Sequence, residues 1–351
     1  MEKTSIKSKI QVLDCTLRDG GLGLEDAYLN CISDIQFKYS DIDSLIRYLS
    51  HSDIDIIELG SIEISDMNKK GFAIYQNIQE VSKKIPNNKS NRQMYVGLYR
   101  GPDTNLDEIP DWNEELVDGV RVIIRYSELE KSLEFCSELS NKGYKVFVQP
   151  MLTMRYTDEE LDMIIKATNE MNAYALYFVD SYGYMQEGDV KRLFEYFDKR
   201  LNPCIKIGFH AHNNMNLAFS NVVSFINFAA DHRDIIIDSC CIGMGQGAGN
   251  LQTEIITSYL NMNYNAQYCF SKILDACEII EKYMSANLWG YSVTRLLPAI
   301  HKTAYKYAVA MRKKYNLKFS RINELLEKMP QELRNRYTSE NLKKLLEEND
   351  I

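Results

Sequence analysis

The stretch "IKIGFHAHNNMNLAFSNVVSFINFAA", residues 205–230, joins two sequence patterns. Residues 205–212 form a short run of β-branched, aromatic and small residues, which is typical of a strand. Residues 213–230 carry apolar side chains at helical spacing and begin with asparagines, which suit helix capping. The stretch therefore predicts one strand followed by one helix.

The same unit recurs along the chain. Seven further short apolar runs occur at residues 10–16, 54–60, 93–99, 119–125, 144–150, 174–180 and 234–241. Amphipathic helical patterns lie between them, such as residues 41–52, 127–143, 157–172 and 187–202. Eight strands that alternate with helices at spacings of roughly 25 to 40 residues predict a (β/α)8 TIM barrel of the α/β class. A doubly wound open sheet is the alternative, but no GxGxxG motif follows the first strand.

The last part of the chain has a different pattern. Residues 267–284, 295–315 and 319–329 repeat apolar side chains at helical spacing without intervening strands. We expect residues 1–265 to form the TIM-barrel catalytic domain and residues 266–351 a helical C-terminal region. The apolar faces of this region are expected to pack on the barrel and to offer a surface for a homo-oligomer.

Composition restricts the classes of partner. The 351 residues carry a formal net charge of -8 and no Lys/Arg-rich run, which argues against nucleic acid as a partner. No apolar signal region and no apolar run of roughly 18 residues is present, so we expect a cytoplasmic protein without a membrane partner. The eight cysteines form no CxxC pair, and we expect them to be reduced thiols.

His210 and His212 predict a metal site. Alternate residues of a strand point to the same side, so both imidazoles are expected together at the C-terminal mouth of the barrel. A pair of hydrogen-bonded core histidines is the alternative. Asp19, in "LDCTLRDGG" at the end of the first strand, would complete a set of two histidines and one carboxylate. Such a set leaves open positions for a divalent metal, with Mn²⁺ expected first and Mg²⁺, Co²⁺ or Zn²⁺ as alternatives.

Four motifs, in order, resemble one superfamily. They are "DCTLRDGG" (14–21), "VDSYGYM" (179–185), "GFHAHNNMNLAFSN" (208–221) and "IDSCCIGMGQGAGN" (237–250). Over about residues 10–260 the chain resembles the DRE-TIM metallolyases, also called the HMG-CoA lyase-like or pyruvate carboxyltransferase superfamily. The third motif and the glycine loop "GMGQGAGN" most resemble those of the 4-hydroxy-2-oxovalerate aldolases.

The resemblance implies roles for named residues. It implies that Asp19, His210 and His212 bind the metal, with Asn250 as a further ligand. It implies that Arg18 stabilises the enolate of a 2-oxo acid, that Ser181 contacts the substrate carboxylate, and that Tyr291 in "WGYSV" reaches the active site. Separately, Arg125 and Gln149 end the fourth and fifth strands and indicate a polar or anionic substrate.

Leu22 departs from the aldolase pattern, which has a histidine there to move the proton. Other groups considered for that task are Glu25, Tyr28, Arg125, Tyr291, His301 and a metal-bound water. The favoured function is a divalent-metal-dependent aldolase that joins or cleaves a 2-oxo acid and an aldehyde through a pyruvate-type enolate. The alternatives are a Claisen-type synthase for an acyl-CoA and a 2-oxo acid, and a metal-retaining scaffold without catalysis. An iron oxygenase is also conceivable, although Arg18 and the strand pattern argue against it.

Overall fold

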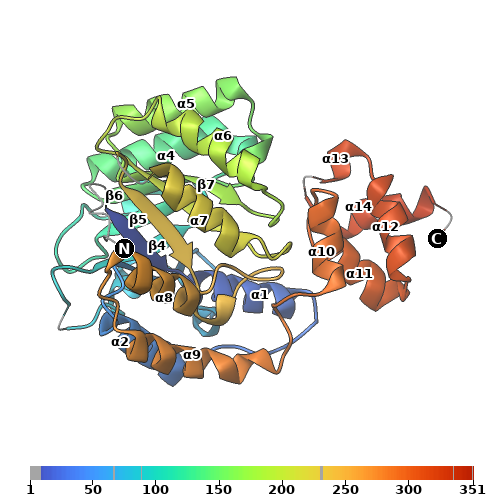
Figure 1. Ribbon diagram of the computed structural model, residues 1–351, viewed down its shortest axis with the longest axis horizontal. Helices are drawn as coiled ribbons and strands as arrows, with labels where there is room; N and C mark the ends of the chain where they lie inside the picture. The colour runs from blue at the N-terminus through green and yellow to red at the C-terminus, as the bar shows by residue number, and fades with distance from the viewer. Residues whose placement is uncertain (1–8, 66–67, 88, 230–231, 335, 350) are drawn as a thin grey trace.

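Eight parallel strands close into a barrel (Figure 1) in this computed structural model, which describes residues 9–65, 68–87, 89–229, 232–334, 336–349 and 351. The barrel strands are β1 (Ile10–Asp14), β2 (Ile56–Ile62), β4 (Met94–Tyr99), β5 (Gly119–Ile124), β6 (Lys145–Pro150), β7 (Ala175–Asp180), β8 (Lys206–Ala211) and β9 (Ile235–Ser239). Strand β1 pairs with both β9 and β2, which closes the sheet, and the two-residue strand β3 (Ile74–Tyr75) adds to β2. Each predicted strand run overlaps one barrel strand. The TIM barrel is confirmed, and the open-sheet alternative is wrong.

Helices cover the outside of the barrel. They are α2 (Tyr39–Ser50), α3 (Ile78–Ser82), α4 (Leu129–Asn141), α5 (Asp158–Glu170), α6 (Glu187–Asp198), α7 (Ala218–Ala229) and α8 (Thr253–Tyr264). Helix α1 (Gly21–Leu29) instead continues from the turn after β1, and its Gly23 packs against Gly245 at the barrel mouth. Helix α5 shows how sequence fixes such an element: Thr157 and Glu160 form a capping box, and Leu161, Ile164 and Ile165 make its buried face. Ala230, at the end of the predicted 213–230 pattern, lies outside the described residues.

Short helical turns follow several strands. A π-helical turn, η1 (Thr16–Gly20), follows β1 directly. The 3-10 turns are η2 (Lys70–Phe72), η3 (Leu106–Glu108), η4 (Tyr126–Glu128), η5 (Thr153–Arg155) and η6 (Cys241–Gly243). Among the described residues, no helix has the length and apolarity needed to cross a membrane. All eight cysteines are free.

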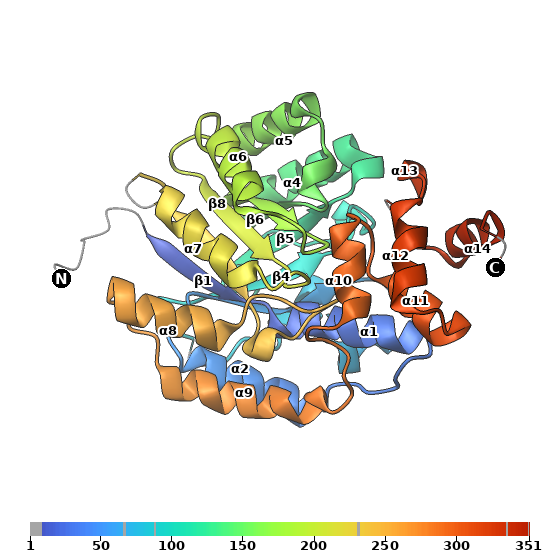
Figure 2. The same cartoon turned by 45° about the vertical axis from the view of Figure 1, so that its right-hand side comes forward.

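The C-terminal part of the chain contributes to two cores. The buried residues Ile273, Ala276 and Ile280 of α9 (Phe270–Met284) belong to the same core as the barrel and its helices. A second core, which includes Tyr307 and Leu326, joins α10 (Val293–Ile300), α11 (Lys306–Tyr315), α12 (Phe319–Glu327), α13 (Gln331–Arg334) and α14 (Ser339–Glu347). Figure 2 shows these last helices at one side of the barrel, with α11 beside α1. The division at residues 265/266 stays a prediction, and the packing of α9 favours a division nearer α10.

Candidate metal centre at the barrel mouth

Three side chains predicted as ligands meet at the C-terminal mouth of the barrel. The π-helical turn after β1 holds Asp19, and the end of β8 presents His210 and His212 on one side. The two Nε2 atoms are 3.2 Å apart, and His212 Nε2 lies 4.0 Å from Asp19 Oδ2. One candidate ligand atom from each residue lies within 4.8 Å of the others. All three residues are buried.

The hydrogen bonds of the two imidazoles involve their Nδ1 atoms and leave their Nε2 atoms available to bind a metal. His210 Nδ1 lies 2.9 Å from Asp238 Oδ2, and His212 Nδ1 lies 3.2 Å from the carbonyl oxygen of Gln246. A carboxylate and a carbonyl accept hydrogen bonds, so we assign the imidazole hydrogen to Nδ1 in both rings. Two Nε2 lone pairs then face each other at 3.2 Å. A bound cation would relieve that repulsion, so the pair fits a metal better than a packed core.

The protonation states also fit metal binding. Burial lowers the pKa of His210 to well below its usual value, and the nearby Arg18 guanidinium lowers it further. Burial lowers the pKa of His212 as well. Burial acts to raise the pKa of Asp19, but the charge of the Arg18 guanidinium and the hydrogen bond from Asn250 favour the ionised form, and the net pKa is lowered. Neutral imidazoles and an ionised carboxylate are the forms that ligate metals.

Asn250 lies beside this set on the glycine loop. Its Nδ2 donates to Asp19 Oδ2 at 2.6 Å and to the carbonyl oxygen of Met244 at 3.3 Å. Its Oδ1 is buried and has no hydrogen-bond partner among the described residues. A side chain at Gly245 would run into both Asn250 and Asp19, so glycine permits the loop to approach. The orphaned Oδ1 makes Asn250 a suitable further oxygen ligand.

A buried network of charges surrounds the set. Arg18 Nε donates to Glu58 Oε2 at 2.8 Å, and Arg121 Nη1 donates to the same oxygen at 2.6 Å. Arg121 also donates to Asp238 and, at 3.2 Å, to Gln149 Oε1. Sequence reasoning missed Glu58, Arg121 and Asp238. The signal that could have found them is a charged residue within an otherwise apolar strand.

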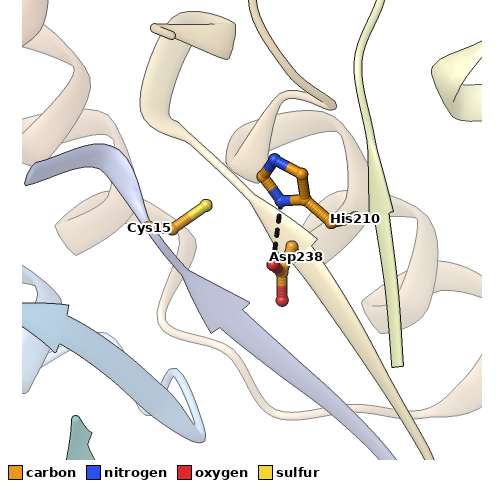
Figure 3. Close-up of side chains that lie close together, drawn as sticks. All are labelled: Cys15, His210 and Asp238. Atoms are coloured by element: carbon orange, nitrogen blue, oxygen red, sulfur yellow. Dashed lines mark hydrogen bonds and ion pairs between the residues drawn. The ribbon is translucent and has the colours of Figure 1, made fainter. Parts of the chain in front are cut away.

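A second group of candidate ligands shares His210. Cys15, His210 and Asp238 also bring one ligand atom each within 4.8 Å, and Figure 3 shows the Cys15 thiol pointing toward the other two. Burial raises the pKa of the Cys15 thiol, which disfavours the thiolate that a metal needs. Asp238 is already engaged by Arg121 and His210. We therefore interpret Asp238 as the residue that orients His210, and Asp19, His210 and His212 as the candidate ligands.

The remaining predicted site residues have different environments. Ser181, just after β7, accepts a hydrogen bond from the Leu152 amide at 2.9 Å, and Gln149 joins the buried network through Arg121. The Arg125 guanidinium instead pairs with Asp103 and Glu128, neither of which contacts the metal set. Tyr291 is 57% exposed. The structure thus joins Gln149 to the cluster and turns the Arg125 guanidinium toward Asp103 and Glu128. The amide of Gly290, the residue before Tyr291, donates to the Ala248 carbonyl oxygen of the glycine loop at 3.1 Å, and the roles of Ser181 and Tyr291 stay predictions.

The groups considered for proton transfer are also placed. Leu22 is buried in the barrel core, so no titratable group stands at that position. Glu25 pairs with Lys69 at 2.8 Å and with Arg100 at 2.9 Å. Tyr28 is 37% exposed, and His301 Nε2 lies 2.9 Å from Asn323 Oδ1. None of these contacts reaches the metal set.

A family model described as HMGL-like matches residues 9–280, from just before β1 into α9. The chain belongs to this family. A 4-hydroxy-2-oxovalerate aldolase from Thermomicrobium roseum is 27% identical over 273 residues, which cover 77% of this chain and 72% of the relative. An oxaloacetate decarboxylase from Mycobacterium tuberculosis is 25% identical over 271 residues, which cover 76% of this chain and 74% of the relative.

Solved structures confirm the fold of the family. The N-terminal domain of a candidate aldolase from Bacteroides vulgatus has a TM-score of 0.72 and 23% sequence identity, and covers 87% of this chain and 98% of its own. At that identity the likeness concerns the fold alone. Together with the aldolase-named relatives, family membership confirms two predictions: the superfamily, and an enzyme of the lyase class.

Proposed function

We propose that the chain is a divalent-metal-dependent aldolase that makes or breaks a carbon–carbon bond next to the enolate of a 2-oxo acid, with an aldehyde as the other substrate. The observation that carries this proposal is the pair of facing Nε2 atoms beside an ionised Asp19. Relatives named 4-hydroxy-2-oxovalerate aldolase and oxaloacetate decarboxylase support it, because their names share 2-oxo acid chemistry.

Each residue has a role that its contacts support. Asp19, His210 and His212, with Asn250, would hold a divalent metal, which we propose to be Mn²⁺. A mixed set of imidazole nitrogens and side-chain oxygens admits Mn²⁺, and it also admits Zn²⁺ or Co²⁺. When bound, the ion would supply Lewis-acid polarisation of a 2-oxo group. Arg18, held by Glu58 and Asp19, offers fixed positive charge to the enolate oxygen. Ser181 is the proposed contact for the substrate carboxylate. The cytoplasmic location and the homo-oligomer stay predictions.

Exchange of pyruvate methyl protons for deuterium tests this function without knowledge of the aldehyde. With Mn²⁺-loaded protein in D2O, proton NMR should show exchange that depends on protein and metal. Replacing Arg18 by Ala should lower the rate by about 10²- to 10³-fold, the scale for loss of one oxyanion donor, with Mn²⁺ still bound. Arg18→Lys, which keeps the charge beside Glu58, should retain more activity. Arg200→Ala, on the surface after α6, is the matched control and should exchange like the wild type.

Two further variants separate catalysis from a scaffold role. His210→Ala should lose both Mn²⁺ binding and exchange. Leu22→His places an imidazole where the chain now has a buried leucine and should speed cleavage of 4-hydroxy-2-oxo acids if only the proton relay is missing. An absence of exchange in the metal-loaded wild type, combined with no gain from Leu22→His, would contradict the aldolase and favour the metal-retaining scaffold.

A further inference from the structure

Gln149 carries a buried hydrogen-bond donor without a partner at the barrel mouth. Its side chain is 5% exposed, and its Nε2 has no hydrogen-bond partner among the described residues. The Oε1 atom of the same amide accepts a hydrogen bond from Arg121 Nη2 at 3.2 Å. Because an arginine only donates, the amide oxygen faces Arg121 and the NH2 group faces away from it. A buried donor without an acceptor is costly, which indicates a donor for a bound ligand.

The pairing of β5 with β6 places Gln149 above Arg121, on the side of the mouth. Arg121 pairs with Phe147, and Ile123 pairs with Gln149, so Gln149 lies two residues nearer to the carboxyl ends of the strands. Arg121 and Ile123 point to the same side of β5. Arg121 is fully buried, whereas Ile123 is partly exposed. The Gln149 amide is therefore anchored from below by Arg121, with the barrel mouth above it.

Gln149 also lies between the metal set and the proposed carboxylate contact. Arg121 Nη2 contacts both Gln149 and Asp238. Asp238 Oδ2 in turn lies 2.9 Å from His210 Nδ1, so a single guanidinium nitrogen and one carboxylate separate Gln149 from a candidate metal ligand. On the other side, the loop that follows Gln149 donates a backbone amide to Ser181 Oγ at 2.9 Å. A small substrate that contacts His210 and Ser181 would lie beside this amide.

The proposed function leaves one oxygen of a 4-hydroxy-2-oxo acid without a partner. Ser181 is assigned to the carboxylate, and the metal and Arg18 are assigned to the 2-oxo oxygen. The oxygen on carbon 4, which is the aldehyde oxygen in the condensation direction, has no assigned contact, and the apolar Leu22 offers none. We propose that Gln149 Nε2 donates a hydrogen bond to this oxygen. The inference rests on the proposed function and adds the residue that recognises the aldehyde side of the substrate.

This contact has a defined chemical role. Negative charge develops on the oxygen of carbon 4 as the carbon–carbon bond forms or breaks, and a fixed amide donor stabilises that charge. A carboxamide does not take up the proton, so Gln149 is a hydrogen-bond donor and the base is a separate group. Pyruvate has no fourth carbon, so exchange of its methyl protons does not use the contact.

Two variants separate the donor from the contact with Arg121. Gln149→Glu keeps an oxygen for Arg121 and replaces the NH2 donor with an acceptor, and Gln149→Met removes both. In the Mn²⁺-loaded full-length protein, both variants should exchange pyruvate methyl protons like the wild type. Both should cleave 4-hydroxy-2-oxopentanoate about 10²-fold more slowly, the scale for loss of one oxyanion donor. Gln93→Met, at a buried glutamine whose Nε2 donates to the carbonyl oxygens of Leu49 and Ile54, is the matched control and should leave both reactions unchanged.

Ligand discrimination tests the same contact when cleavage is slow. 2-Oxopentanoate has the carbon skeleton of 4-hydroxy-2-oxopentanoate without the oxygen on carbon 4. As inhibitors of the initial rate of pyruvate exchange, the hydroxy acid should bind about tenfold more tightly to the wild type, and Gln149→Glu should remove this preference.

The outcomes distinguish the contact from the function. Equal binding of the two acids by the wild type, or a preference that survives in Gln149→Glu, would overturn the proposal for Gln149 alone. Loss of exchange together with cleavage in both variants would also overturn it, since Gln149 would then act only by supporting Arg121. Absence of exchange in the wild type would contradict the aldolase itself, and this role of Gln149 with it.

Discussion

The hydrogen bond from His210 Nδ1 to Asp238 determines which imidazole nitrogen faces the other candidate ligands. Asp238→Asn should weaken Mn²⁺ binding by about 10- to 100-fold, the usual effect of removing a carboxylate that orients a histidine ligand. The loss has two causes, because an amide no longer fixes the tautomer and the buried Arg121 loses a counter-charge. Competitive titration with a metal indicator measures the affinity.

Asp14→Asn is the matched control for this substitution. Asp14 is a buried aspartate at the end of β1 that accepts hydrogen bonds from Thr253 Oγ1 at 2.7 Å and from the Thr16 amide at 3.0 Å. It has no contact with the metal set, so its substitution should affect stability more than Mn²⁺ affinity. Similar losses of affinity in both variants would mean that Asp238 acts only through general stability.

For single residues, the alternation of side chains along a strand predicted some members of the site and could not predict others. His210 and His212 are two residues apart, so the geometry of one strand is enough to bring them together. Glu58 and Arg121 are 63 residues apart, and they become partners because β4 pairs with both β2 and β5, which the sequence of one strand does not reveal. Arg125 lies one residue beyond the end of β5, where alternation no longer fixes direction, and its guanidinium turns to Asp103 instead.

The loop that follows β9 and carries Gly245 and Asn250 packs tightly against the candidate metal ligands. Gly245→Ala would press a β-carbon against the Asn250 amide and the Asp19 carboxylate. Both groups are buried and hydrogen-bonded to each other, so the substitution should cost roughly 1 to 3 kcal/mol of stability, the usual range for overpacking. It should also weaken Mn²⁺ binding. Thermal unfolding and metal titration measure the two effects.

Gly188→Ala provides the control within a helix. A β-carbon at Gly188, in the first turn of α6, would meet no atom within 4 Å. That substitution should leave Mn²⁺ affinity unchanged and should be neutral or stabilising by up to about 1 kcal/mol, since alanine favours helix more than glycine does. Unchanged metal binding in Gly245→Ala would show that the loop can move aside without disturbing Asn250.

The sequence predicted whether a segment forms a helix or a strand better than it predicted where a helix is interrupted. The eight strands were predicted because short apolar runs between amphipathic helices leave few other interpretations. Residues 295–315 repeat apolar side chains at helical spacing, and they form two helices, α10 and α11, with a turn between them. Lys302 adopts a left-handed φ of 53° in that turn, which ends α10 although the apolar spacing continues. The spacing of apolar residues indicates which side chains are buried, and it does not indicate such a turn.

On the scale of the whole molecule, closure of the barrel creates the candidate site. Asp19 follows the first strand, and His210 lies near the end of β8, which is separated from it along the chain by most of the barrel. Pairing of β9 with both β1 and β8 brings the two regions side by side. The sequence predicted this meeting because a TIM barrel places the carboxyl ends of all its strands at one mouth.

The two cores predict where the chain can be shortened. A chain that ends at residue 265 lacks α9, whose Ile273 and Ile280 are fully buried against the barrel. Losing these two side chains alone removes roughly 3 to 6 kcal/mol of apolar burial and exposes the face that they cover. A chain that ends at residue 291 keeps α9 and Trp289 with the barrel core and removes only the helices around the second core.

We therefore expect chain 1–291 to be soluble, to unfold cooperatively and to bind Mn²⁺, and chain 1–265 to aggregate or to unfold without a cooperative transition. Circular dichroism melting and size-exclusion chromatography of both chains measure the difference. If chain 1–265 proved as stable as chain 1–291, α9 would not belong to the barrel, and the division at 265/266 would be the better description.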